Sequence, residues 1–337
     1  MEISEVELIR RIRGLASSIQ GKAVVGIGDD TAVVEGRPGF QYLLTTDALV
    51  EGTHFRWDIA PACDIGRKSL AVNCSDVAAM GGRPLFALVS LGIPVTCSSS
   101  VITEFYEGMF SLASQHSVEV SGGDIVRSPV FFASVSLLGE VDSGKFVRRC
   151  GARPGDGIYV TGSLGCAAAG LECLLNDVPC EGSWRERLVR RWRNPSPRIN
   201  EARQIAPLAT SMIDTSDGLS SDLAHILEES GVGAELWEDA LPIVEELRAY
   251  CELTGKHPTR FVLEGGEDYE ILFTSSCVDD SGINFACPVT MIGRITRGNY
   301  LVLIGESNHR TVLEPKGWDH FGAITQIAEE QINRNRR

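Results

Sequence analysis

The chain has 337 residues, of which 43% are hydrophobic and 23% charged, and a formal net charge of −14 at pH 7. This length is long for one domain and predicts two domains of about 150 residues, each able to bury its own core. The negative charge argues against a nucleic acid or an anionic membrane as a partner.

The first half of the chain alternates helical and strand-like segments. Residues 1–15 carry apolar side chains at a helical period, and several later segments are short and β-rich. We expect helices at 1–15, 64–80 and 99–115, and strands at 23–27, 31–35, 42–46, 85–93 and 130–141. Glycine and charged residues between positions 142 and 156 indicate the domain junction, so we place the domains at 1–147 and 148–337.

The second half alternates strands and helices less regularly. We expect strands at 157–161, 212–213, 270–274, 289–295 and 300–304, and helices after 165, at 184–193, at 198–208 and from 218 to about 230. Because the alternation does not form strict βαβ units, it favours layered α+β domains over a doubly wound parallel sheet.

The cysteines and the lack of long apolar runs indicate the cellular compartment of the protein. None of the ten cysteines forms a Cys-x-x-Cys pair, and a chain of this size needs no disulfide to fold. No apolar run reaches the roughly 18 residues of a membrane span, and the acidic N-terminus lacks the apolar core of a signal peptide. We therefore expect a cytoplasmic protein with no membrane partner.

Short acidic motifs, most of them flanked by glycine, are the most informative feature of the chain. They contain Asp29, Asp30, Asp47, Asp76, Asp124, Asp214, Asp217, Glu267 and Asp268. We expect Asp47, Asp76 and Asp124 at the ends of strands or helices, where loops form sites. Carboxylate oxygens of this kind suit Mg²⁺, which bridges protein carboxylates to substrate phosphates. The motifs thus indicate a metal-dependent enzyme that handles phosphates.

Each motif also has a structural interpretation. A single Asp-Gly turn is more often an Asx turn or a helix cap than a metal ligand, and Asp217 could cap the helix that follows it. The doubled acid Asp29-Asp30 favours metal binding, because one cap would suffice. Since the chain has neither a Walker A loop nor protein-kinase signatures, metals held by carboxylates would have to neutralise a bound nucleotide.

Four other features have two interpretations each. The turn at 162–165 resembles a dinucleotide-binding turn but lacks the G-x-G-x-x-G pattern, so a simple helix start is favoured. The basic segment 185–193 is typical of a solvated helix face rather than a nucleic-acid site on so acidic a chain. His54 is either a structural histidine or a hydrogen-bonding partner of a substrate. Trp318 either packs or stacks on a cationic ring.

The motifs taken together resemble the thiamine-monophosphate kinases. The matching segments are 26–30, 46–47, 50–55, 75–82, 122–129, 151–156, 214–219 and 264–270. They follow the family's order along nearly the whole chain, and Glu-Gly-Gly-Glu-Asp-Tyr-Glu at 264–270 is specific within the superfamily. That superfamily also holds aminoimidazole-ribonucleotide synthetase, selenophosphate synthetase and a hydrogenase-maturation protein, which all consume ATP. The departures, Thr53, Cys74 and Cys150, remove no ligand.

The resemblance implies transfer of the ATP γ-phosphoryl group to thiamine monophosphate, giving thiamine diphosphate. It implies several Mg²⁺ ions, with the ligands Asp30, Thr45, Thr46, Asp47, Asp76, Asp124, Asp214 and Asp217. It implies ATP contacts from Tyr106, Gly123, Asp124, Arg149 and Ser216, with Arg148 as the alternative to Arg149. It implies thiamine monophosphate contacts from His54, Glu267 and Trp318. The implied fold has two α+β domains resembling aminoimidazole-ribonucleotide synthetase, with a layered C-terminal domain and N-terminal sheets that pair across a homodimer.

The chemistry of the acceptor agrees with this assignment. A phosphate monoester has a second pKa of about 6 and is largely a dianion at neutral pH, so it needs no general base. The protein then has to hold two anions in line and neutralise their charge. Two other classes stay open. One is a superfamily synthetase, although residues 1–22 lack the reactive cysteine of a selenophosphate synthetase. The other is a non-catalytic protein of the same fold, which would be expected to lose several acids.

Overall fold

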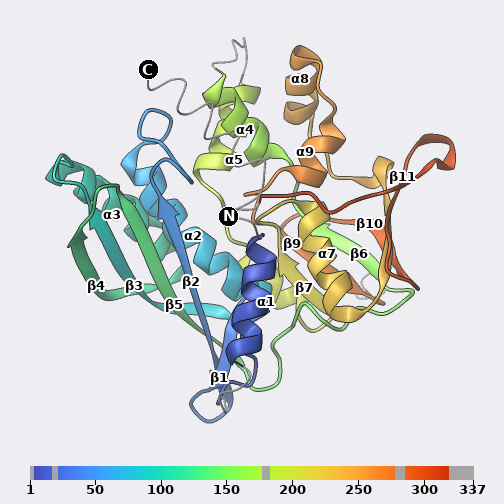
Figure 1. Ribbon diagram of the computed structural model, residues 1–337, viewed down its shortest axis with the longest axis horizontal. Coiled ribbons are helices and arrows are strands. Elements are labelled where there is room, and N and C mark those ends of the chain that lie inside the picture. The colour runs from blue at the N-terminus through green and yellow to red at the C-terminus, as the bar shows by residue number, and fades with distance from the viewer. Residues whose placement is uncertain (1–3, 17–21, 177–182, 278–284, 319–337) are drawn as a thin grey trace.

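The computed structural model describes residues 4–16, 22–176, 183–277 and 285–318. Figure 1 shows two lobes side by side, each a sheet with helices against it, so both are built as α+β layers. The N-terminal sheet has five strands in the order β1-β2-β5-β3-β4, and the C-terminal sheet seven in the order β12-β11-β8-β10-β6-β9-β7. None of the described helices is long and apolar enough to cross a membrane.

The N-terminal lobe packs two long helices on one face of its sheet. Its elements are α1 (Glu5–Ala16), β1 (Ala32–Glu35), β2 (Phe40–Val50), α2 (Ala62–Ala79), β3 (Arg83–Ile93), α3 (Ser99–His116), β4 (Glu119–Arg127) and β5 (Phe132–Asp142). All neighbouring strands of this sheet are antiparallel except β3 and β4, which are parallel.

In the described part of the C-terminal lobe, six helices shorter than α2 and α3 accompany the sheet. Its elements are β6 (Gly157–Thr161), α4 (Cys166–Leu175), α5 (Trp184–Arg193), α6 (Ile199–Ile205), β7 (Ser211–Asp214), α7 (Leu219–Ser230), β8 (Gly233–Trp237), α8 (Glu245–Thr254), α9 (Pro258–Glu264), β9 (Ile271–Ser275), β10 (Val289–Thr296), β11 (Leu301–Ile304) and β12 (Arg310–Val312). Among the described strands of this lobe, β8 and β11 pair in parallel and the other pairs are antiparallel.

Most expected elements are confirmed, and the differences are local. The expected strand at 23–27 forms only isolated bridges, such as Val25 with Val33. The strands β4, β8 and β12 and the helices α8 and α9 were not expected. The prediction that Asp47, Asp76 and Asp124 lie at element ends is wrong, because they lie within β2, α2 and β4. The strand β2 continues to Val50 because its whole length pairs with β5.

Helix α2 joins the two lobes. Nearly all of its side chains are buried, since it packs on β2, β3, β5 and α3 of its own lobe and on α6 and β7 of the other. Its sequence mixes small and apolar residues with several buried polar ones, among them Lys68, Asn73 and Ser75, so the helix is buried on nearly every side without being uniformly apolar. A single rigid element therefore carries residues of the N-terminal lobe to the junction between the lobes (Figure 1).

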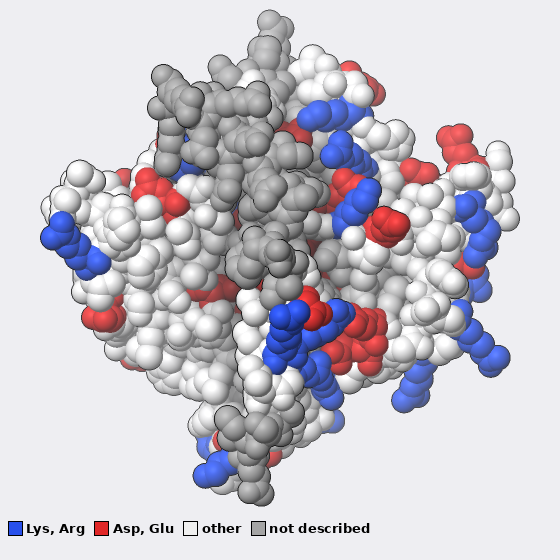
Figure 2. Space-filling model, viewed as in Figure 1, with Lys and Arg blue, Asp and Glu red and all other residues white. Residues whose placement is uncertain are grey.

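Helix α1 lies across the front of the molecule against α7. Arg10 pairs with Glu228 at 2.5 Å and Arg13 with Glu229 at 2.9 Å, and α1 has no buried residue. Figure 2 shows the resulting mixture of basic and acidic side chains on this face. Exposed ion pairs contribute about 0–1 kcal/mol each, so α1 is held weakly.

The close contact of α2 with α3 depends on glycine. A Cβ atom on Gly108 would overlap the carbonyl oxygen of Cys63, and one on Gly66 would overlap that of Phe105. We expect Gly108→Ala to lower the free energy of unfolding by about 1–3 kcal/mol or more, because two backbones have to separate. The matched control is Gly14→Ala in α1, where a Cβ meets nothing within 4 Å. Equal thermal stability of the two variants would contradict this packing.

Candidate active site

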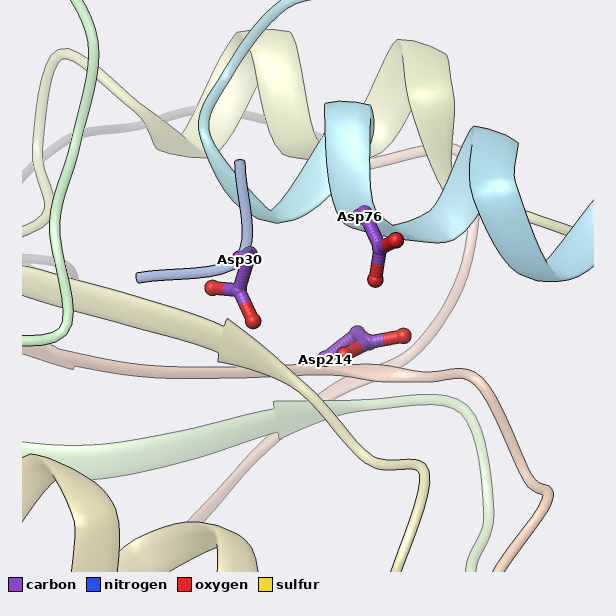
Figure 3. A group of neighbouring side chains, drawn as sticks. All are labelled: Asp30, Asp76 and Asp214. Carbon is purple, nitrogen blue, oxygen red and sulfur yellow. The ribbon is translucent and has the colours of Figure 1, made fainter. Parts of the chain in front are cut away.

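Three carboxylates meet at the junction between the lobes. Asp30 comes from the loop before β1, Asp76 from α2 and Asp214 from the end of β7 (Figure 3). One oxygen of each lies within 4.8 Å of the others. The sequence predicted all three as metal ligands, and the fold brings them together from three separate segments. We call Asp30, Asp76 and Asp214 the carboxylate cluster.

In the carboxylate cluster Asp30 and Asp214 are buried and Asp76 is half-buried, and the acids outnumber the one arginine, Arg149, that pairs with Asp30. Burial, and then the charge of Asp30, raises the pKa of Asp214 to about 7. Burial, followed by the charges of Asp47 and Asp214, raises the pKa of Asp76 well above its usual range. Oδ2 of Asp30 is buried and has no hydrogen-bond partner among the described residues. This set of carboxylate oxygens fits Mg²⁺, which binds oxygen ligands at about 2.1 Å. Small movements of the three side chains would bring one oxygen of each to that distance from a shared ion.

Neighbouring polar groups orient the cluster. The hydroxyl of Thr45 donates to Asp76 at 2.6 Å, and that of Ser75 donates to Asp214 at 2.5 Å. Oδ1 of Asn73 accepts the backbone N–H of Asp47 at 3.0 Å. Ser75 and Asn73 were not predicted as site residues, although both stand in the same short motif as Asp76. Besides supplying Asp76, this motif therefore supplies side chains that hold Asp214 and Asp47 in place.

Thr46 does not present its side chain to the cluster. Its hydroxyl donates to the carbonyl oxygen of Val135 at 3.1 Å and accepts from Ser136. Successive residues of a strand point to opposite faces, so Thr46 faces away from Thr45 and Asp47. Only the backbone of Thr46 remains available for an ion on the cluster side.

The doubled acid before β1 is explained by two arginines. Asp29 accepts from Nε of Arg148 at 3.0 Å and from the backbone N–H of Arg149 at 3.2 Å. Oδ1 of Asp30 accepts from Arg149 at 2.6 and 3.2 Å. Arg149 is therefore the arginine whose side chain reaches the carboxylate cluster, and Arg148 lies one step outside it.

The turn after β7 and the segment 264–270 form one unit beside the cluster. The carbonyl oxygen of Ser216 accepts the N–H of Glu267 at 2.8 Å, and that of Asp217 accepts the N–H of Trp318 at 3.2 Å. Two predicted site residues, Ser216 and Asp217, thus lie on the turn directly after Asp214, and two others, Glu267 and Trp318, are bound to that turn through their backbones. The N-cap of α7 is Gly218, and the carboxylate that accepts the N–H groups of Asp217 and Gly218 belongs to Asp222.

The other acids of the segment 264–270 are structural. Asp268 accepts the N–H groups of Gly165 at 2.5 Å and Ala167 at 3.0 Å, which stabilises the start of α4. Burial raises the pKa of Asp268 to about 7. Glu270 pairs with Arg198 through two contacts of 2.6 Å. The turn at 162–165 leads into α4, as favoured from the sequence. The group that binds its backbone N–H is the carboxylate of Asp268.

The basic segment 185–193 has the solvated helix face expected from the sequence, with Arg187 and Arg190 exposed, and it also has a packed face. Leu188 and Trp192 of α5 are buried, and Nε of Arg193 donates to the carbonyl oxygen of Ile59 in the N-terminal lobe at 2.9 Å. Arg191 donates to Ser163 at 3.1 Å. The helix α5 therefore contributes contacts between the lobes, which its charge alone did not indicate.

Three predicted residues lie on the α3–β4 side of the N-terminal lobe, away from the cluster. Tyr106 of α3 stacks on Phe110. Gly123 and Asp124 stand on the edge strand β4, and the register runs from Gly123 through β3 and β5 to Asp47. Three strand spacings amount to about 14 Å. A single ion at the cluster therefore cannot also bind Asp124 of the same chain.

His54 occupies the turn that follows β2. Its Nδ1 atom accepts the backbone N–H of Val50 at 3.1 Å. This contact fixes the ring on the turn and leaves Nδ1 engaged, so the structural interpretation of His54 has direct support. A contact to a substrate would have to come from Nε2.

Comparison with known proteins finds relatives that match nearly the whole chain. Residues 28–141 match the family model of the AIR synthase related protein N-terminal domain, and residues 153–314 match that of its C-terminal domain. The thiamine-monophosphate kinase of Aquifex aeolicus is 39% identical over 320 residues, which are 95% of this chain and 99% of that protein. The thiamine-monophosphate kinase of Escherichia coli K12 is 36% identical over 327 residues, again 95% and 99%.

A solved structure agrees with these matches. The structure of AaThiL complexed with AMPPCP and TMP has a TM-score of 0.85 and 38% identity, and covers 95% of this chain and 98% of that one. Both lobes are therefore shared in sequence and in three-dimensional arrangement. On this ground the chain belongs to the thiamine-monophosphate kinase family of the AIR synthase related proteins.

Proposed function

We propose that the protein transfers the γ-phosphoryl group of ATP directly to thiamine monophosphate, giving ADP and thiamine diphosphate, and that Mg²⁺ is required. The carboxylate cluster carries this proposal, since it combines three converging acids with a buried oxygen of Asp30 that has no hydrogen-bond partner in the described part of the chain. Its position beside the turn after β7 fits a site where two phosphate-bearing substrates meet. The named relatives support the same reaction.

Several ions would be needed to occupy all the predicted ligands. Asp30, Asp76 and Asp214 would hold one ion, with Thr45 and Asp47 beside them. Thr46 would contribute through its backbone, whereas Asp217 and Asp124 would serve further ions. Bound Mg²⁺ would neutralise the phosphate oxygens of both substrates and orient them.

The remaining residues divide between the two substrates. For ATP we propose Arg149 and Ser216 near the cluster, and Tyr106, Gly123 and Asp124 on the α3–β4 side. For thiamine monophosphate we propose His54, Glu267 and Trp318. No side chain is assigned as a general base, because the acceptor phosphate is already a nucleophile at neutral pH.

We also propose that the protein is a homodimer whose N-terminal sheets pair. Leu44, Phe86 and Leu88 lie exposed on the outer face of that sheet, and Ile125 lies exposed on its edge strand. A contiguous apolar surface of this kind is typical of an interface. The limits of the domains at 1–147 and 148–337 and a cytoplasmic location likewise stay predictions.

Light scattering should give about twice the chain mass of 36.5 kDa. We expect Leu88→Lys to shift the protein toward a monomer, because it places a charge in the apolar contact. The matched control is Leu253→Lys on α8, whose side chain is exposed to a similar extent, 56% against 53%. A monomeric unaltered protein would contradict the dimer.

The choice of acceptor tests the reaction. We expect purified protein with Mg²⁺ and ATP to release ADP when thiamine monophosphate is added, and not with aminoimidazole precursors. Release of ADP with an aminoimidazole precursor alone would favour a superfamily synthetase. No release with any acceptor would favour a non-catalytic protein. Full activity on free thiamine with none on its monophosphate would also contradict the proposal.

A further inference from the structure

A buried lysine of the N-terminal lobe contacts Glu267, an acid of the segment 264–270 in the C-terminal lobe. Lys68 of α2 is 1% exposed, and its Nζ lies 2.5 Å from Oε1 of Glu267. Nε1 of Trp192 on α5 donates to Oε2 of Glu267 at 2.5 Å. The Lys68 ammonium also lies 4.6 Å from the centre of the Trp192 ring. Lys68 belongs to the N-terminal lobe, and Trp192 and Glu267 belong to the C-terminal lobe. The three side chains contact one another at the junction between the lobes.

Both oxygens of Glu267 are thereby fixed. Its backbone is held as well, because it has a left-handed φ of 67° and its N–H donates to Ser216 at 2.8 Å. A non-glycine residue in this conformation is strained and persists where the surroundings determine it. A carboxylate has about four lone-pair positions, so each oxygen can still accept one more hydrogen bond. Glu267 is thus a pre-oriented acceptor beside the turn after β7.

Stability alone does not account for this arrangement. Removing a lysine from water is costly, and an apolar pair of similar volume is often as stable as a buried ion pair. The neighbours of Lys68 one turn away on α2 include Ile65, Ala71 and Val72, which are buried and apolar, so an apolar side chain at position 68 would suit these surroundings. The ion pair instead ties Glu267 to the same helix that carries Asp76 and Ser75.

We propose that Lys68 is a positioning residue for thiamine monophosphate, acting with Trp192 to hold the Glu267 carboxylate as an acceptor for the N–H donors of the substrate ring. This inference rests on the proposed function. Because Lys68 neutralises the charge of Glu267, recognition depends on hydrogen-bond geometry more than on attraction to the cationic ring. Lys68 itself touches no substrate.

A double-mutant cycle in the full-length protein tests this. The variants are Lys68→Met, Glu267→Gln and the two combined. We expect each single variant to raise KM for thiamine monophosphate by about tenfold to a hundredfold, since a hydrogen bond to a charged group is lost. KM for ATP should change less than about twofold. The combined variant should be no worse than Glu267→Gln alone, because Lys68 acts through Glu267.

Two further variants separate positioning from folding. Trp192→Phe keeps the ring and removes the donor to Oε2, so it should raise KM for thiamine monophosphate even where Lys68→Met fails to fold. Arg193→Met removes another contact of α5 with the N-terminal lobe and should leave that KM unchanged.

Additive effects in the cycle would overturn the inference. So would an equal rise in KM for ATP, or a lower melting temperature with KM for thiamine monophosphate unchanged in both Lys68→Met and Trp192→Phe. Each of these results would leave the proposed function intact if the unaltered protein is active. An unaltered protein that makes no thiamine diphosphate would refute the proposed function and this inference together.

Discussion

Replacing Asp76 or Asp214 by asparagine should reduce turnover by orders of magnitude while leaving the metal-free protein at least as stable as the unaltered chain. Asparagine keeps the size of the side chain and removes the charge that Mg²⁺ needs. In the absence of metal, the carboxylates of the cluster are buried or half-buried and their charges repel one another, so removing one charge relieves that repulsion. The ADP-release rate in Mg²⁺ and the melting temperature in EDTA measure the two effects.

A buried carboxylate outside the cluster is the control. Oδ2 of Asp156 accepts the N–H of Arg153 at 3.0 Å and the hydroxyl of Thr210 at 2.7 Å. We expect Asp156→Asn to lose about 1 kcal/mol of stability with turnover largely intact, as a structural hydrogen-bond acceptor would. If Asp76→Asn and Asp214→Asn follow this structural pattern, destabilised yet active, the cluster is not a metal site.

The stability gained by Asp214→Asn in EDTA should grow as the pH rises. Asp214 loses its proton near pH 4 in the unfolded chain and near pH 7 in the folded chain. The stabilisation from the protonated folded form is therefore fully present below about pH 4 and is lost as the pH rises through 7. One pKa unit corresponds to about 1.4 kcal/mol, so the difference between the variant and the unaltered chain should reach several kcal/mol of unfolding free energy.

Melting temperatures of both proteins at pH 5 to 8 measure this difference. Saturating Mg²⁺ at pH 8 should reverse the order, because only the unaltered chain offers all three carboxylates to the metal. A difference that is the same at pH 5 and pH 8 would mean that the carboxyl of Asp214 has an ordinary pKa, and that the cluster is neither buried nor repulsive as described.

Strong periodicity made most of the fold predictable from the sequence. The helices α2, α3 and α7 and the long strands β3 and β5 carry clear apolar patterns, and the structure has them within a few residues. The strand β4 was missed because Glu119–Arg127 is exposed along nearly all its length and contains two adjacent glycines. Its parallel pairing with β3 determines its conformation, and no local pattern reports such pairing.

The sequence predicted the acidic residues of the site but not the residues that contact them. Asp30, Asp76 and Asp214 stand out in sequence because each lies in a short polar motif next to glycine, serine or threonine. Their convergence depends on the packing of α2 against both lobes. The spacing of the motifs along the chain does not predict that packing. Lys68 and Trp192 were missed because each is a single residue on a helix, and a single buried lysine is recognised only once its partner is known.

The most direct measurement follows thiamine diphosphate and ADP together in the unaltered protein supplied with ATP. With Mg²⁺ and thiamine monophosphate present, we expect one thiamine diphosphate for each ADP. Omitting thiamine monophosphate should stop ADP release, and excess EDTA should stop both products, because the phosphates would then meet an uncompensated carboxylate cluster. Formation of thiamine diphosphate at an unchanged rate in excess EDTA, or ADP release that ignores thiamine monophosphate, would contradict the account.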